Sequence, residues 1–294
     1  MARPAEVLDA AVEESAEQAG PGSILTVASA TGGCGKTFFA TNVAALAARG
    51  GKRVVLVDLD LQFGEVAAAL QIRPQYSLYD GLYGQNGKPL PEGTFAEHLD
   101  ELVVRHPLGF DVLTAPRDPA LADYVGARDA DAVLDVVARS YDVVVVDTPP
   151  SLNEIVLTAL ERSDVVTVMA TLDIPSLKNL SVFLDTLRRL KVDDSRLRLV
   201  LNKIDKDVGI DVKQTQEAFN DRFVGFIPQS RAVSRAMNIG RVVIETEPRS
   251  SVARKVTDAI VAVVPADLRP ASSEASSSGI WARLRRLFTK GTNS

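Results

Sequence analysis

The sequence has few of the residues that build disulfides, metal clusters or aromatic surfaces. Its 294 residues include one cysteine, Cys34, and two histidines, His98 and His106, and only 5% of the chain is aromatic. A single cysteine excludes an intrachain disulfide and a cysteine-cluster metal site. Two histidines argue against a zinc centre. Neither kind of site is therefore expected here.

Long apolar segments are also missing. No run approaches the ~20 consecutive apolar residues that cross a bilayer. The first residues, MARPAEVLDAAVEESAEQAG, are acidic and lack an apolar centre, so they do not form a secretory signal. We therefore expect a cytoplasmic protein.

Charge is unevenly spread along the chain. The formal net charge is −5, but residues 279–294 contain four basic residues and no acidic one, which leaves −9 for the rest. An acidic body argues against broad binding of nucleic acid by that body. The basic end indicates a partner of its own.

Apolar residues, mainly valine and alanine, gather in alternating kinds of segment. Short continuous runs predict strands buried on both faces, and longer helical patterns lie between them. The alternation predicts an α/β fold: a doubly wound, mainly parallel sheet with helices on both faces. The predicted strands are Ile24–Ala28, Val54–Val57, Phe110–Leu113, Val143–Val146, Val165–Met169, Leu197–Leu201 and Phe223–Ile227. The predicted helices are Gly35–Arg49, Asp129–Arg139, Pro175–Leu190, Ile210–Asn220, Ser230–Asn238 and Ser251–Val264.

Composition divides the chain into four segments. Residues 1–22 form an acidic leader that we expect to be flexible, and residues 23–265 form the globular domain. Within that domain, residues 71–108 are irregular and are interpreted as a short helix and loop beside the sheet. Residues 266–278 are rich in Ser, Ala and Pro and predict a linker to a helix at 279–291.

A glycine-rich segment, GGCGKT at residues 32–37, joins the first predicted strand to the first predicted helix. Its three glycines allow backbone N–H groups to turn toward an anion beside the helix N-terminus. Lys36 would contact the β- and γ-phosphates of a nucleotide, and the Thr37 hydroxyl would hold Mg²⁺. The segment departs from the usual G-x-x-x-x-G-K-[ST] pattern because Ala30 stands at the first glycine. A helix cap with a solvated lysine is the structural alternative.

Carboxylates follow two predicted strands, at the edge where ligands bind to such sheets. Asp58 and Asp60 follow one strand, and near a phosphate they could hold hydrated Mg²⁺ and orient the attacking water. Asp147 follows four valines and has the position of a Walker B carboxylate, which binds Mg²⁺ through water. For Asp58 or Asp60 alone, a polar strand end that caps the next helix is the alternative.

Asn202 ends another predicted strand. Its amide both donates and accepts hydrogen bonds, which matches an adenine edge. A turn-forming asparagine fits the position equally well.

In this order and spacing, the motifs resemble those of the MinD/ParA family of deviant-Walker P-loop ATPases, over roughly residues 23–265. The resemblance implies an ATP-dependent homodimer that uses ATP and Mg²⁺. It implies that Lys36, Asp60 and Asp58 act in hydrolysis, and that Thr37, Asp58 and Asp147 hold Mg²⁺. The implied nucleotide contacts are Gly32, Gly33, Cys34, Gly35, Lys36, Thr37, Phe38, Asn202, Pro228 and Gln229.

Within that family the sequence is most similar to the CpaE/TadZ branch, the ATPases of Flp/Tad pilus assembly. The similarity lies in DLDLQFGEVAAAL (58–70), TAPRDPALADYV (114–125), YDVVVVDTPPSLNE (141–154), LDIPSLKNL (172–180) and IPQSRAVSRAMNIGRVV (227–243). This branch implies pilus or secretion-machinery proteins as partners.

Two loop residues depart from the family pattern. Thr31 stands where the family has its signature lysine, which reaches the nucleotide of the partner subunit, so we expect slow or absent hydrolysis. Phe38 stands where a second threonine is usual, which removes one hydroxyl near the α-phosphate. Cys34 in the loop is either an oxidation switch or simply a small residue that fits.

The last helical pattern, GIWARLRRLFTKG, has two different faces. Its apolar residues fall within an arc of about 120° at 100° per residue, and basic residues cover the remainder. This pattern predicts a helix on an anionic membrane surface, similar to the C-terminal targeting helix of MinD, with docking on the body or on a partner as the alternative. The predicted membrane residues are Ile280, Trp281, Leu284, Leu287 and Phe288 on the apolar face and Arg283 and Arg286 on the basic face.

The sequence therefore favours an ATP-dependent switch with weak ATPase activity that positions pilus or secretion machinery, peripherally on the cytoplasmic face of the membrane. A ParA-type chromosome- or plasmid-partitioning ATPase is the first alternative, although the acidic body makes DNA an unexpected partner. A hydrolysis-deficient nucleotide-binding scaffold is the second, because of Thr31.

Overall fold

The computed structural model describes residues 20–84, 86–205, 207 and 209–269. The first 19 residues of the predicted leader, the predicted linker from residue 270 onward and the predicted membrane helix at 279–291 lie outside these ranges. The membrane prediction for that helix therefore stays a prediction.

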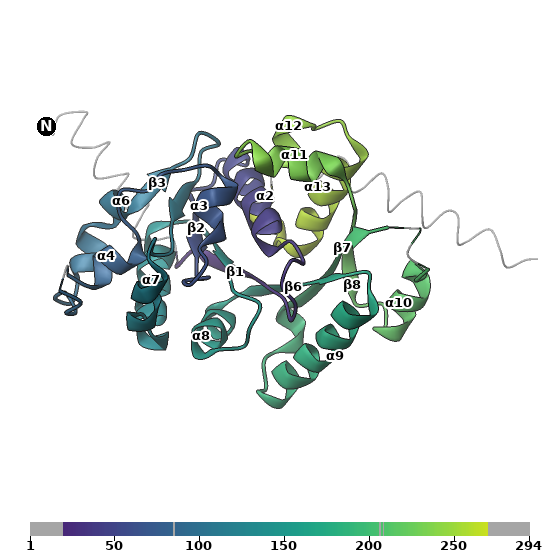
Figure 1. Ribbon diagram of the computed structural model, residues 1–294, viewed down its shortest axis with the longest axis horizontal. Coiled ribbons are helices and arrows are strands. Elements are labelled where there is room, and N and C mark those ends of the chain that lie inside the picture. The colour runs from purple at the N-terminus through teal and green to yellow at the C-terminus, as the bar shows by residue number, and fades with distance from the viewer. Residues whose placement is uncertain (1–19, 85, 206, 208, 270–294) are drawn as a thin grey trace, which may run out of the picture.

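A single mainly parallel sheet runs through the described part of the chain (Figure 1). Its eight described strands lie in the order β3-β4-β2-β5-β1-β6-β7-β8, and only β3 runs antiparallel to its neighbour. The strands are β1 (Ser23–Ala28), β2 (Val54–Asp58), β3 (Val103–Arg105), β4 (Asp111–Leu113), β5 (Val143–Asp147), β6 (Val165–Thr171), β7 (Leu197–Ile204) and β8 (Phe223–Pro228). The predicted α/β fold with a mainly parallel sheet is confirmed.

Helices cover both faces of the sheet (Figure 1). One face carries α2, α11, α12 and α13, which share a core with the sheet, and α7, α8 and α9 cover the other face. The helices are α2 (Lys36–Arg49), α3 (Glu65–Ala69), α4 (Leu78–Leu82), α5 (Thr94–Glu97), α6 (Leu99–Leu102), α7 (Ala127–Ser140), α8 (Glu154–Arg162), α9 (Ile174–Arg189), α10 (Val212–Ala218), α11 (Arg231–Asn238), α12 (Val243–Thr246) and α13 (Ser251–Val263).

The continuous apolar runs mark the central strands because water reaches neither face of them. All five residues of β2 and of β5 are buried. Apolar side chains at every position remove the largest area from water there, whereas an alternating pattern would bury polar groups. The seven predicted strands are therefore found within three residues of their predicted ends.

Four parts of the chain differ from the sequence-based expectation. Residues 71–108 hold three short helices, α4, α5 and α6, followed by β3, where one helix and a loop were expected. Helices α3, α8 and α12 were not predicted. The start of α8 had a signal, because Asn153 caps it by accepting a hydrogen bond from the Val156 N–H at 2.9 Å.

Parallel strands bring their carboxyl ends to one edge of the sheet. Strands β1, β5 and β2 lie side by side there, and β6 and β7 continue the same edge. The glycine-rich segment, Asp58, Asp147 and Asn202 all follow or end these strands, so the fold gathers them. In the described part of the chain no helix is long and apolar enough to cross a bilayer.

Candidate nucleotide-binding site

The side chain of Asn202 holds the glycine-rich loop in place. Gly35 has a φ of 92°, and a Cβ at this position would lie 2.4 Å from the Asn202 Nδ2 atom. That same nitrogen donates a hydrogen bond to the Cys34 carbonyl at 2.7 Å. Only glycine combines this backbone conformation with so close an approach. The Asn202 Nδ2 atom thus faces the loop. Its predicted contact with adenine stays a prediction.

Helix α2 begins immediately after this loop and offers an anion site. Its N-cap is Gly35, and no side chain in the described ranges caps the N–H groups of the first turn. Lys36 and Thr37 occupy that turn and are only 8% and 6% exposed. Unpaired N–H groups at a helix N-terminus, with a nearby lysine, favour a phosphate.

The Thr37 hydroxyl links the loop to the end of β5. It donates a hydrogen bond to Asp147 Oδ2 at 2.5 Å, and Asp147 is 1% exposed. The other carboxylate oxygen, Asp147 Oδ1, is buried and has no hydrogen-bond partner among the described residues. A buried oxygen of this kind is costly unless a further group satisfies it.

Mg²⁺ fits this pair of oxygens. Hydroxyl and carboxylate oxygens, completed by water and nucleotide phosphates, are its preferred ligands. Within the described ranges no cluster of three or more His, Cys, Asp or Glu side chains forms a metal site by itself. Thr37 and Asp147 would therefore hold the ion together with phosphate oxygens of the nucleotide, as the sequence predicts.

The electrostatic balance of the site also favours a cation. Burial raises the pKa of Asp147 to about 7, against the opposing effects of the Thr37 hydrogen bond and of Lys36. Burial raises the pKa of Asp58 well above its ordinary value, and the charge of Asp147 adds to the rise. The pKa of Asp60 is raised by burial and lowered by Lys36. Burial therefore favours the neutral form of these carboxyls, and a cation bound beside them would favour the charged form.

Both carboxylate oxygens of Asp58 accept hydrogen bonds from backbone N–H groups that follow it in the chain. Oδ1 accepts the Asp60 N–H and Oδ2 accepts the Val66 N–H, each at 3.1 Å. These bonds fix the loop between β2 and α3, which carries Asp60. The predicted roles of Asp58 and Asp60 in metal binding and hydrolysis stay predictions, and the observed role of Asp58 is to anchor that loop.

A cavity of about 370 Å³ opens beside the loop. Predicted and unpredicted residues line it together. The predicted ones are Gly33, Gly35, Lys36, Thr37, Phe38, Asn202, Pro228 and Gln229. The unpredicted ones are Glu65, Lys203, Ser230, Arg231, Val233, Ser234 and Met237. The size and mixed lining suit a small organic ligand.

Five predicted site residues lie outside this lining: Asp58 and Asp147, whose contacts are given above, and Gly32, Cys34 and Asp60. Cys34 is 1% exposed, and its Sγ atom lies 3.8 Å from Ser176 Oγ, inside the protein. Gly32 faces Pro150. Asp60 instead lines an adjacent cavity of about 330 Å³, together with Pro149 and other residues after β2 and β5.

Comparison with known proteins agrees with this geometry. The family model described as an AAA domain matches residues 22–199. The chain belongs to the MinD/ParA family of P-loop ATPases. It is 31% identical to the chromosome-partitioning ATPase Soj of Thermus thermophilus over 256 residues, which cover 82% of this chain and 96% of that protein.

Solved structures of the MinD/ParA family share the fold. The ParA family ATPase from Chlorobium tepidum superimposes with a TM-score of 0.71 at 22% identity, covering 81% of this chain and 98% of that one. MinD from Pyrococcus horikoshii, solved with Mg-ADP, gives a TM-score of 0.68 at 18% identity, covering 81% and 94%. These relatives carry partitioning and septum-site names, and they do not support the CpaE/TadZ branch expected from the sequence.

The residue at the position of the MinD/ParA signature lysine faces its own chain. The Thr31 hydroxyl accepts a hydrogen bond from Asn179 Nδ2 of α9 at 3.3 Å, and the Thr31 carbonyl accepts one from Ser29 Oγ at 2.8 Å. Thr31 therefore brings no positive charge to this edge. Besides Lys36, the basic residues that line the cavity are Lys203 and Arg231.

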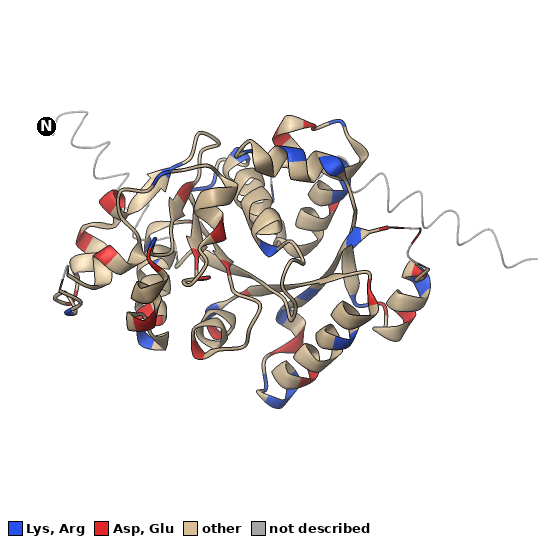
Figure 2. Cartoon of the chain, viewed as in Figure 1, with Lys and Arg blue, Asp and Glu red and all other residues tan. Residues whose placement is uncertain are grey.

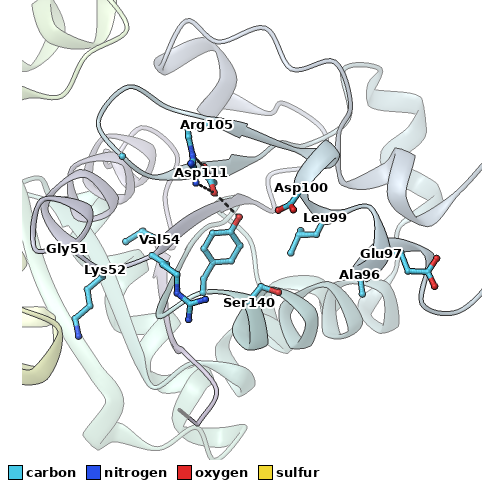
Figure 3. A pocket seen from close by; sticks show the side chains of 13 residues that line it. Gly51, Lys52, Val54, Ala96, Glu97, Leu99, Asp100, Arg105, Asp111 and Ser140 are labelled. Carbon is cyan, nitrogen blue, oxygen red and sulfur yellow. Dashed lines mark hydrogen bonds and ion pairs between the residues drawn. The ribbon is translucent and has the colours of Figure 1, made fainter. Parts of the chain in front are cut away.

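A larger cavity of about 450 Å³ lies at the opposite, amino edge of the same sheet, below β2, β4 and β5 (Figure 3). Figure 3 shows Arg105 and Asp111 pointing toward each other, and their atoms lie 3.1 Å apart. Asp111 also accepts a hydrogen bond from the Tyr141 hydroxyl at 2.9 Å. Its buried carboxylate is already satisfied, and the cavity has no glycine-rich helix start, so it is a poor nucleotide site for a MinD/ParA ATPase.

Proposed function

We propose that this chain binds Mg²⁺ and ATP at residues 32–37 and hydrolyses the ATP, as a ParA-type partitioning ATPase. The single observation that carries the proposal is the Thr37 hydroxyl bonded to a buried Asp147, whose second oxygen has no partner in the described ranges. A phosphate-bound divalent ion would satisfy this buried oxygen, which is otherwise costly to leave without a partner.

The chain's own residues divide the work. The N–H groups of the loop and Lys36 bind the phosphates, and Thr37 and Asp147 hold the ion. When bound, Mg²⁺ supplies positive charge that stabilises the negative charge developing on the phosphates. Asp60 orients the attacking water, since it lies on the loop that Asp58 anchors at the same edge of the sheet.

Partitioning is proposed over pilus assembly because of the relatives. The 31% identity to a chromosome-partitioning ATPase extends over nearly the whole length of that protein. The pilus role rests only on the short sequence stretches quoted above. On the described surface, acidic and basic residues are interspersed over the helices of both layers (Figure 2). A weak, salt-sensitive contact with DNA suits this surface better than a broad one.

The test of the site is nucleotide binding and turnover by the purified chain. We expect the wild type to bind ADP and ATP with Mg²⁺ and to turn ATP over slowly, because Thr31 replaces the signature lysine. Lys36→Ala should abolish binding, and Asp60→Ala should keep binding but lose turnover. Failure of the wild type to bind either nucleotide contradicts the proposal.

A second assay distinguishes a partitioning ATPase from a membrane-bound switch. Retention of the ATP-bound protein on DNA, lost at high salt, supports partitioning. ATP-dependent recovery on anionic liposomes, lost in a chain truncated after Ser278, supports the membrane switch instead. ATP-dependent dimers are expected in both cases and are measured by light scattering.

A further inference from the structure

Glu65 lies beside the Thr37 hydroxyl, although the sequence predicted no role for it. It is the first residue of α3, and its Oε2 atom lies 3.3 Å from Thr37 Oγ1. On the other side of that hydroxyl, Asp147 Oδ2 lies at 2.5 Å. The hydroxyl thus sits between two carboxylates from different parts of the fold.

The backbone on both sides of Glu65 is fixed. The Gly64 N–H donates to the Asp60 carbonyl at 2.7 Å, and the Val66 N–H donates to Asp58 at 3.1 Å. Gly64 has a φ of 51°, which turns the chain directly into α3. Glu65 is therefore placed at the site by the same bonds that place the loop of Asp60.

The charge of Glu65 reaches the other acidic groups. It adds to the raised pKa of both Asp60 and Asp147. Glu65 also lines the cavity that Lys36 and Thr37 line. A nucleotide that enters without a metal ion brings more negative charge next to this carboxylate, whereas one that enters with Mg²⁺ brings a cation.

We propose that Glu65 is a positioning residue that makes nucleotide binding depend on Mg²⁺, by receiving the hydrated ion beside Thr37 and repelling metal-free phosphates. The proposal rests on the proposed function of this site. It differs from a purely structural role because it requires opposite effects on binding with and without the metal.

The test is a fluorescence titration of labelled ADP onto the full chain, first in excess chelator and then across a range of free Mg²⁺. For Glu65→Gln we expect metal-free ADP to bind about fivefold to tenfold more tightly, since one unit of repulsion at close range has been removed. The concentration of Mg²⁺ at half-maximal effect should rise by a similar factor of about five to ten. Glu65→Asp, which keeps the charge, should retain most of the Mg²⁺ dependence.

Glu161→Gln, on the exposed surface of α8, is the matched control and should behave as wild type. The proposal is overturned if Glu65→Gln binds ADP like the wild type at every Mg²⁺ concentration. It is also overturned if binding weakens by the same factor with and without the metal. A wild type that binds no nucleotide overturns the proposed function itself, which separates the two failures.

Discussion

Replacing Asp147 by asparagine should make the folded chain more stable relative to wild type as the pH rises. The pKa of this carboxyl is about 7 in the folded chain against an ordinary 3.8, and burial is the largest cause. A carboxyl whose pKa rises on folding holds its proton more tightly in the native state. Stability from this group is therefore present at low pH and is lost as the pH rises through about 7.

The magnitude follows from that shift. Each pKa unit corresponds to about 1.4 kcal/mol, so the full loss is about 4 kcal/mol, of which about 2 to 3 kcal/mol falls between about pH 5 and about pH 8. Asparagine is neutral at every pH and can still accept the Thr37 hydrogen bond. Its fixed packing cost is the same at both pH values and cancels in the comparison.

The assay is urea unfolding of wild type and Asp147→Asn without Mg²⁺ or nucleotide. The free energy of unfolding of the variant, relative to wild type, should rise by about 2 to 3 kcal/mol from about pH 5 to about pH 8. Asp111→Asn is the control, because that buried carboxylate is paired with Arg105 and Tyr141 and should only destabilise. A difference for Asp147→Asn that stays constant or falls with pH refutes the reasoning.

Four further changes test other parts of the molecule. Gly35→Ala should cost about 1–3 kcal/mol in urea unfolding and weaken ADP binding, since its Cβ would meet Asn202; unchanged stability contradicts this. Asn202→Ala, which removes the bond to the Cys34 carbonyl, should cost about 1–2 kcal/mol in the same assay. Thr31→Lys should raise ATP turnover about tenfold, roughly the size of one added charge contact, in a phosphate-release assay. Trp281→Glu should lower recovery on anionic liposomes and leave ADP binding intact; equal recovery would disprove the membrane helix.

The central sheet could be predicted because its signal is local. Val143–Val146 is a run of four valines, and the structure buries all of them in β5. Strand β3 escaped prediction because it has three residues, and its side chains are partly or fully exposed. So short a segment at the rim of a sheet has neither a continuous apolar run nor a clear period of two.

The site residues likewise divide into those that local sequence predicted and those that it did not. Lys36 and Thr37 could be assigned from six consecutive residues, because the loop and the helix start are neighbours in sequence. Glu65 lies 28 positions after Thr37, and no spacing rule joins them. Asn202 was predicted to end its strand, whereas β7 continues to Ile204; its donor bond to Cys34 depends on how closely β7 approaches the loop. Tertiary approach of this kind carries no sequence pattern.

The two edge strands of the sheet, β3 and β8, determine how easily copies of the chain could aggregate by strand pairing. At one rim β3 offers only three residues and ends in Arg105, whose side chain is 83% exposed. At the other rim β8 ends in Pro228, which lacks an N–H. Short, charged or proline-ended rims give a neighbouring chain little backbone to pair with. Aggregation of copies of the chain through the edges of their sheets is therefore disfavoured.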